Sequence, residues 1–128
     1  MLRGFATISY YAADLAAAQA WYTELLGIEP YFQMSGYIEF RVGDYQHELG
    51  IIDAQYAPPG GVGPAGAVMQ WHVDDVQGTL DRLLELGATE YQPVTDRGQG
   101  FVTASVVDPF GNILGFMYNP HYLEVLEG

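Results

Sequence analysis

The sequence predicts an α+β fold made of two similar βαβββ halves that form a curved, mixed-sheet cup with helices on its outer face. The main observation is a repeat: Asp14 and Asp74 each follow an apolar strand pattern and precede a helical pattern that closes with Leu-Gly. The length of 128 residues, 49% of them hydrophobic, is typical of one packed domain. A helix that covers one face of each sheet leaves the other face open.

The first half is expected to span residues 1–56. Asp14 can accept hydrogen bonds from the first turn of a helix, and Gly27 can adopt the left-handed conformation that ends one. Between them, apolar residues recur at helical spacing. The flanking segments are rich in β-branched and aromatic residues, as strands are. The elements predicted for this half are strands at 5–11, 28–32, 37–42 and 46–52 and a helix at 15–26.

The second half is expected at residues 67–122, followed by a short C-terminal tail. Before it, residues 57–66 contain three prolines and four glycines, which predict a linker or a mobile flap. Asp74 and Asp75 suit a helix start, Asp108-Pro-Phe-Gly suits a turn, and Pro120 stops the last strand. The elements predicted for this half are strands at 68–73, 91–94, 100–107 and 113–118 and a helix at 76–86.

The charge balance excludes one class of partner. Sixteen acidic residues face four basic ones, and the net charge of −12 repels phosphate backbones, so we expect no nucleic-acid binding. No apolar run approaches the ~20 residues that cross a membrane, and the N-terminus has no signal-peptide pattern. The chain has no cysteine. We therefore expect a cytoplasmic protein without membrane contact. The acidity serves solubility or attracts a cationic ligand.

Three motifs carry a resemblance to a known family. They are Asp14-Leu15 with Leu26-Gly27, Trp71-His72-Val73-Asp74-Asp75, and Asp108-Pro109-Phe110-Gly111-Asn112. In this order they resemble the vicinal oxygen chelate superfamily, the glyoxalase, bleomycin-resistance and dioxygenase group, over essentially the whole chain. The resemblance implies the doubled fold, which carries many activities. Enzymes of this family bind a divalent metal through His, Gln or Glu on the first and last strands of each half, and the metal acts as a Lewis acid.

The metal positions that the resemblance implies lack most of their ligands here. They fall on Thr7, Val68, Gly115 and either Glu48 or Gly50, and three of these four positions cannot anchor a metal. We therefore expect no metal and no cofactor, and we assign no catalytic residue. Alternate strand residues share a face, which places a set of side chains in the cup. The predicted ligand-binding residues are Thr7, Ser9, Tyr11, Glu48, Gly50, Gln70, His72, Gly115 and Met117. The predicted helix-packing residues are Ile8, Tyr10, Leu49, Ile51, Met69, Trp71, Leu114 and Phe116.

Several of these residues allow two interpretations. Glu48 could bind a cation, act as a general base or hold one metal position, or it could be a half-exposed strand carboxylate. His72 could bind a metal or move protons, but a surface histidine paired with Asp74 or Asp75 is favoured. Gly50 and Gly115 leave room for a ligand or mark a bend. The aromatic residues are expected mostly in the core, with some lining an apolar pocket; they are Tyr11, Tyr31, Phe32, Tyr37, Phe40 and Phe101.

The other two histidines are expected outside the cup. His47 should face away from it if Glu48 faces in, and His121 is expected in the tail, against the other half or a second subunit.

The leading hypothesis is a metal-independent binding protein for a small organic molecule, cationic or aromatic. Its resemblance to the antibiotic-sequestering branch implies a homodimer. One alternative is a metal-dependent glyoxalase-related lyase or isomerase, or a dioxygenase, which needs an unusual ligand set such as Glu48 and His72 with waters. Another is a regulatory or scaffold module without a ligand.

Overall fold

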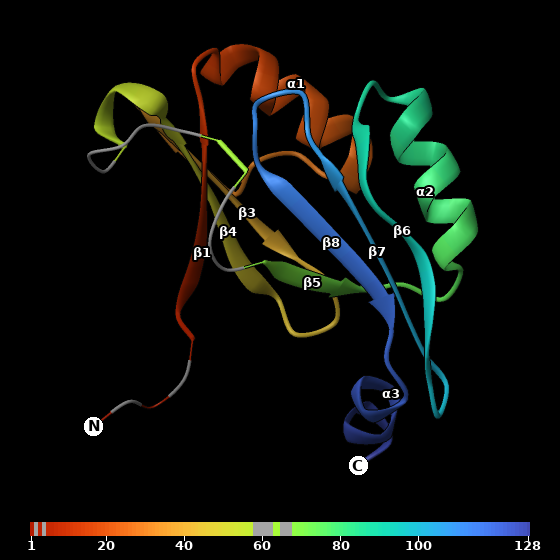
Figure 1. The fold of residues 1–128 in the computed structure, drawn as a ribbon. Coiled ribbons are helices and arrows are strands. Elements are labelled where there is room, and N and C mark those ends of the chain that lie inside the picture. Colours follow the sequence, from red (N-terminus) through yellow and green to blue (C-terminus); the bar gives the residue numbers. More distant parts are fainter. Residues whose placement is uncertain (2, 4, 58–62, 65–67) are drawn as a thin grey trace. The chain divides into compact units, whose positions relative to one another are not determined.

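The computed structural model describes residues 1, 3, 5–57, 63–64 and 68–128 (Figure 1). Tertiary contacts divide the chain into two compact units, Met1–Gly63 (unit 1) and Pro64–Gly128 (unit 2). Most of the predicted linker at 57–66 lies outside the described residues. The α+β class and the two βαβββ repeats are confirmed, because each unit contains one four-stranded mixed sheet and a helix between its first two strands.

Unit 1 has the strand order β1-β4-β3-β2. Strand β1 runs parallel to β4, and the other neighbours are antiparallel. The elements are β1 (Thr7–Ala12), α1 (Leu15–Leu26), β2 (Phe32–Met34), β3 (Tyr37–Val42), β4 (His47–Asp53) and the short 3₁₀ helix η1 (Ala54–Tyr56).

Helix α1 begins and ends where its capping residues predict. The Asp14 carboxylate accepts a hydrogen bond from the Ala17 N–H at 3.0 Å, and Gly27 adopts a φ of 71°. The buried side of α1 packs on the sheet, with the Tyr22 ring 6.0 Å from that of Tyr10. The centre of the sheet face beneath the helix is apolar, as predicted; its most buried members are Tyr10, Ile38, Phe40, Leu49 and Ile51.

Unit 2 repeats this topology in the order β5-β8-β7-β6, again with its first strand parallel to its last. Figure 1 shows α2 alongside β6 and β7. The elements are β5 (Met69–His72), α2 (Val76–Glu85), β6 (Thr89–Gly98), β7 (Phe101–Val107), β8 (Ile113–Tyr118) and α3 (Pro120–Glu127). The buried residues between α2 and the sheet are Val76, Leu80, Leu83, Ala104, Val106, Leu114 and Phe116.

The turn before β8 is built around one buried carboxylate. Asp108 is 3% exposed, and its Oδ1 accepts hydrogen bonds from the N–H groups of Phe110 and Asn112 at 2.9 and 2.8 Å. Its Oδ2 accepts a third from Asn112 Nδ2 at 2.9 Å. The predicted Asp-Pro-Phe-Gly turn is therefore present, and the buried charge is satisfied by these donors.

Three elements differ from the prediction. The second strand begins at Phe32 rather than at residue 28, since Pro30 cannot donate to a sheet. Strand β6 is longer than 91–94 and crosses Pro93 through irregular pairing, as an edge strand can. The predicted tail is helix α3, because the Asn119 side chain accepts hydrogen bonds from the first turn and Pro120 suits the first helical position. No helix in the described part of the chain is long and apolar enough to span a membrane.

Candidate functional site

Helix α1 packs on one face of the unit 1 sheet, and no helix in the described part of this unit packs on the other, which we call the open face of unit 1. Side chains of paired residues on neighbouring strands project to the same side. The register pairs Thr7 with Glu48 and Ser9 with Gly50, so these four predicted site residues share this face. With the partners on β2 and β3, the open face of unit 1 consists of Thr7, Ser9, Tyr11, Phe32, Met34, Tyr37, Glu39, Arg41, Glu48, Gly50 and Ile52.

The centre of this face is occupied by Tyr37. Its hydroxyl donates a hydrogen bond of 2.6 Å to Glu39 Oε1. A Cβ added to Gly50 would lie 2.7 Å from Tyr37 Cε1 and 2.9 Å from the hydroxyl oxygen, so the ring lies directly over this glycine. Gly50 was expected to leave room for a ligand or to mark a bend. In the structure the room above Gly50 is filled by a side chain of the same sheet.

Burial and the carboxylates around Tyr37 favour its protonated form. Burial raises the pKa of Tyr37 from 10.0 to about 12, helped by the hydrogen bond and charge of Glu39 and by the charge of Glu48, while a hydrogen bond with Thr7 opposes the shift. Tyr37 therefore stays protonated at neutral pH and serves as a hydrogen-bond donor. Its bond to Glu39 holds that carboxylate in one orientation. The result is one phenol flanked by two carboxylates, an arrangement that favours positive charge nearby.

Aromatic and apolar side chains lie beside Tyr37 on the open face of unit 1. Phe32 is 46% exposed and Met34 is 60% exposed, and the Phe32 ring lies 6.4 Å from that of Tyr37. The Arg41 guanidinium lies 4.0 Å from the centre of the Tyr31 ring. Sequence reasoning missed Glu39, Arg41 and Met34 as members of this face. The alternation of polar and apolar residues in 37–42 was the signal that could have placed the first two.

The open face of unit 2 has the equivalent arrangement. The predicted residues Gln70 and His72 pair with Gly115 and Met117, so all four share one face of this sheet. A Cβ on Gly115 would lie 2.8 Å from Cδ and Nε2 of Gln70. The Gln70 amide thus covers this glycine as Tyr37 covers Gly50 in unit 1. The two units fill equivalent positions with chemically different side chains.

His72 is buried, which corrects the expectation of a surface histidine. Its side chain is 8% exposed, because the Tyr122 ring of α3 stacks on it with centroids 4.6 Å apart and planes 7° apart, and the Tyr118 ring of β8 lies 5.4 Å away. The Asn119 backbone N–H donates to Nδ1 at 3.1 Å. Since Nδ1 accepts, Nε2 carries the proton in the neutral ring and donates to Asp74 at 3.2 Å. The expected pairing with Asp74 is present, and both ring nitrogens are engaged.

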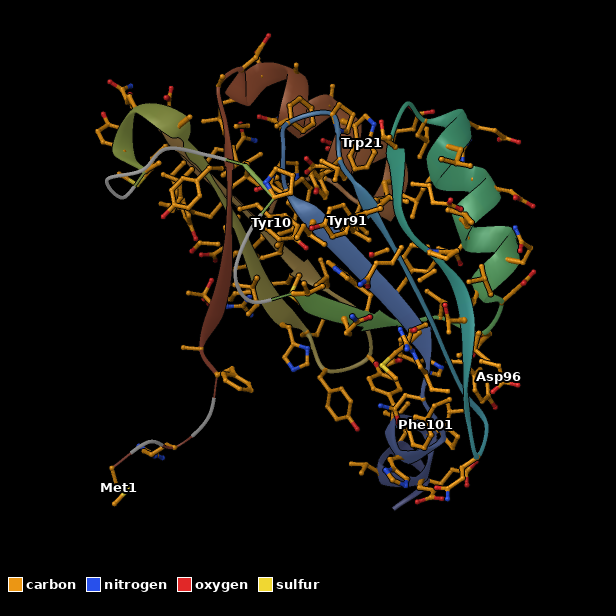
Figure 2. The ribbon with its side chains drawn as sticks, viewed as in Figure 1. Met1, Tyr10, Trp21, Tyr91, Asp96 and Phe101 are labelled. Carbon is orange, nitrogen blue, oxygen red and sulfur yellow. The ribbon has the colours of Figure 1, made fainter. Side chains whose placement is uncertain are left out.

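Of the remaining histidines, His47 pairs with Val42 on the helix side of the unit 1 sheet, and His121 lies in α3. His47 stacks with Tyr45 at 5.6 Å beside the turn between β3 and β4. His121 was expected against the other half or a second subunit. Within unit 2 it packs edge-on against Phe101, with centroids 5.2 Å apart, and Figure 2 shows Phe101 beside α3.

The family's metal site does not fit these residues. Thr7 Oγ1 donates to the Glu48 backbone carbonyl at 3.4 Å, Gly115 has no side chain, and Val68 is apolar. Within residues 1, 3, 5–57, 63–64 and 68–128, no three His, Asp or Glu side chains are grouped so that they could hold a metal ion.

A hollow of about 500 Å³ lies along α1, on the helix side of the unit 1 sheet and away from its open face; its lining residues are Ala16, Gln19, Ala20, Thr23, Glu24 and Glu29.

Comparisons with known proteins agree on the fold. The family model described as "Glyoxalase/Bleomycin resistance protein/Dioxygenase superfamily" matches residues 4–116. No curated protein matches the chain. A solved glyoxalase-related enzyme from Fulvimarina pelagi is 23% identical, with a TM-score of 0.76 over 93% of this chain and 90% of that one. A protein from Agrobacterium tumefaciens is 19% identical, with a TM-score of 0.77 over 91% of this chain and 98% of that one. At these identities the likeness to solved structures extends to the fold alone.

Proposed function

We propose that this chain, which belongs to the Glyoxalase/Bleomycin resistance protein/Dioxygenase superfamily, binds a small organic molecule without a metal ion or other cofactor. The open face of unit 1 is the proposed site. The observation that carries the proposal is the phenol of Tyr37 between two carboxylates, next to the exposed side chains of Phe32 and Met34. Small-molecule sites typically combine aromatic and apolar surface with a few oriented polar groups.

The chemistry of this face favours a ligand that is both aromatic and positively charged. Glu39 and Glu48 outnumber the one cation of this face, Arg41, so the face attracts positive charge, and the net charge of −12 adds a long-range attraction. The rings of Phe32 and Tyr37 offer surfaces for stacking and for cation–π contact. Binding by charge, stacking and hydrogen bonding needs no metal.

The donor set also supports metal independence. Among the positions that the resemblance assigns to the metal, only Glu48 has a carboxylate, while Thr7, Val68 and Gly115 have no suitable donor. Divalent zinc and related ions usually need three or more protein ligands.

By its resemblance to the antibiotic-sequestering branch we also propose a homodimer, which sedimentation equilibrium would test. The absence of cysteine is the basis for proposing a cytoplasmic location.

The experiment is a thermal-shift screen of aromatic cations and of their neutral analogues, followed by titration calorimetry. Glu39→Gln and Glu48→Gln keep side-chain size but remove one charge each. We expect each to weaken the best hit about tenfold, the effect of roughly 1.4 kcal/mol. Glu124→Gln, an exposed carboxylate of α3, is the matched control and should leave the affinity unchanged. If the wild type and the three variants all bound the hit with equal affinity, the ligand would not bind on this face.

A further inference from the structure

The C-terminal helix α3 is attached to unit 2 through contacts centred on His72. Tyr122 stacks on the imidazole, and the Asn119 N–H donates to Nδ1. Beside this contact, His121 packs edge-on against Phe101. The contacts that Asn119 and Tyr122 make with His72 are linked, because the Asn119 side chain also accepts a hydrogen bond from the Tyr122 N–H. They therefore leave His72 together if α3 moves.

Helix α3 has little packing of its own. It has eight residues, none of them buried, and Val125 and Leu126 are 68% and 42% exposed. A helix this short is not stable by itself in water. Segments with few buried apolar contacts open at lower free energy than the sheet to which they are attached. The family match ends at residue 116, before α3 begins. The helix is thus a peripheral element, held on unit 2 by a small number of contacts.

We propose that α3 is an autoinhibitory lid that occupies a binding site at His72 as an internal ligand. In the closed state, a flat ring covers the imidazole and an amide N–H donor fills its Nδ1 lone pair. When α3 lifts, Nε2 stays oriented by Asp74, and Nδ1 becomes a hydrogen-bond acceptor at the edge of the open face of unit 2. A histidine oriented by a carboxylate in this way is a common acceptor of protons and hydrogen bonds.

The contacts that α3 makes with His72 define the chemical class of the external ligand that could replace it. A molecule that replaces α3 needs a planar aromatic ring in place of Tyr122 and an N–H donor in place of Asn119. N-Acetyltyramine has both, and the two carbons between its ring and its N–H let the ring stack on the imidazole while the N–H reaches Nδ1 in the imidazole plane; it is the probe that we choose. The proposal concerns unit 2 and does not depend on the proposed function, whose residues all belong to unit 1.

The first test is hydrogen exchange on the full chain. The amides of residues 123–127 should exchange at least about tenfold faster than those inside β8, and through an opening that does not require global unfolding. If both segments exchanged at one common rate, through global unfolding alone, the proposal that α3 is a lid would be wrong.

The second test measures access to His72 with diethyl pyrocarbonate, with the exposed His47 as the internal reference. In the wild-type chain His72 should react more slowly than His47. Tyr122→Ala should raise the His72 rate about tenfold, whereas Tyr122→Phe, which keeps the ring, should raise it much less. A His72 rate equal to that of His47 in the wild type, or unchanged by Tyr122→Ala, would contradict the proposal. If Tyr122→Ala does not fold, the hydrogen-exchange experiment on the wild type tests the proposal in its place.

The third test uses N-acetyltyramine and nuclear magnetic resonance. Millimolar N-acetyltyramine should shift the His72 ring signals in Tyr122→Ala more than in the wild type, in which α3 competes for the same position. Equal shifts in both proteins, or none in either, would overturn the internal-ligand interpretation.

Discussion

The glycines at equivalent positions of the two sheets should respond in opposite ways to the same substitution. Gly50→Ala places a methyl group 2.7 Å from Tyr37 Cε1 and 2.9 Å from its hydroxyl oxygen, well inside the usual contact distance of about 3.5–4.0 Å. The rigid ring has to move, and the 2.6 Å hydrogen bond to Glu39 is lost. Gly115→Ala meets the end of the Gln70 side chain, which is exposed and flexible and can turn away.

The magnitudes follow from these contacts. Loss of a hydrogen bond to a charged group costs about 1.5–3 kcal/mol, and replacing a strand glycine by alanine returns roughly 0.5–1 kcal/mol. Gly50→Ala should therefore lower the free energy of unfolding by about 1–2 kcal/mol. Gly115→Ala should leave it unchanged or raise it by up to about 1 kcal/mol.

Urea denaturation of the two variants and the wild type measures these differences. A second readout is the pKa of Tyr37, which should fall toward 10 in Gly50→Ala, because the ring leaves its buried place beside Glu39, and should stay near 12 in Gly115→Ala. Equal changes in unfolding free energy for the two variants, or a Tyr37 pKa that Gly50→Ala does not move, would refute the position of Tyr37 over Gly50.

Three further predictions concern single carboxylates and pH. In an ultraviolet titration compared with Tyr37→Phe, Tyr37 should ionise near pH 12, and Glu39→Gln should move this toward 10. Because folding raises the pKa of Tyr37, its contribution to stability is complete below about pH 10 and is lost as the pH rises through about 12. Asp75→Ala removes the acceptor of the Gly78 N–H and should cost about 1 kcal/mol in urea denaturation. Asp108→Asn turns one buried acceptor oxygen into a donor and should cost about 1–3 kcal/mol by the same method.

The fold could be predicted where the determinants are local or periodic. Asp14 and Gly27 mark the ends of α1 by capping chemistry that depends on neighbouring residues alone. Strand alternation placed Thr7 and Glu48 on the same face, and the register confirms it. Helix α3 was missed although its signal is local too, since Asn119 followed by Pro120 is a typical helix start.

The candidate site was less predictable, because it depends on contacts between distant side chains. Glu39 became part of it through the hydrogen bond from Tyr37, and the space above Gly50 is closed by the same ring. The burial of His72 depends on Tyr118 and on Tyr122, the latter fifty residues along the chain in a helix that was not predicted from the sequence. Residue types and alternation identify a face, but they do not determine which side chain lies over which.

The central claim, binding of an organic ligand without a metal, is tested most directly by the metal content of the chain purified without a histidine tag. The measurement is elemental analysis, followed by titration calorimetry with nickel, zinc and manganese. Because Thr7, Val68 and Gly115 offer no suitable donors, we predict no bound divalent ion and no heat of binding. About one tightly bound divalent ion per chain would contradict the claim and favour a metal-dependent lyase, isomerase or dioxygenase.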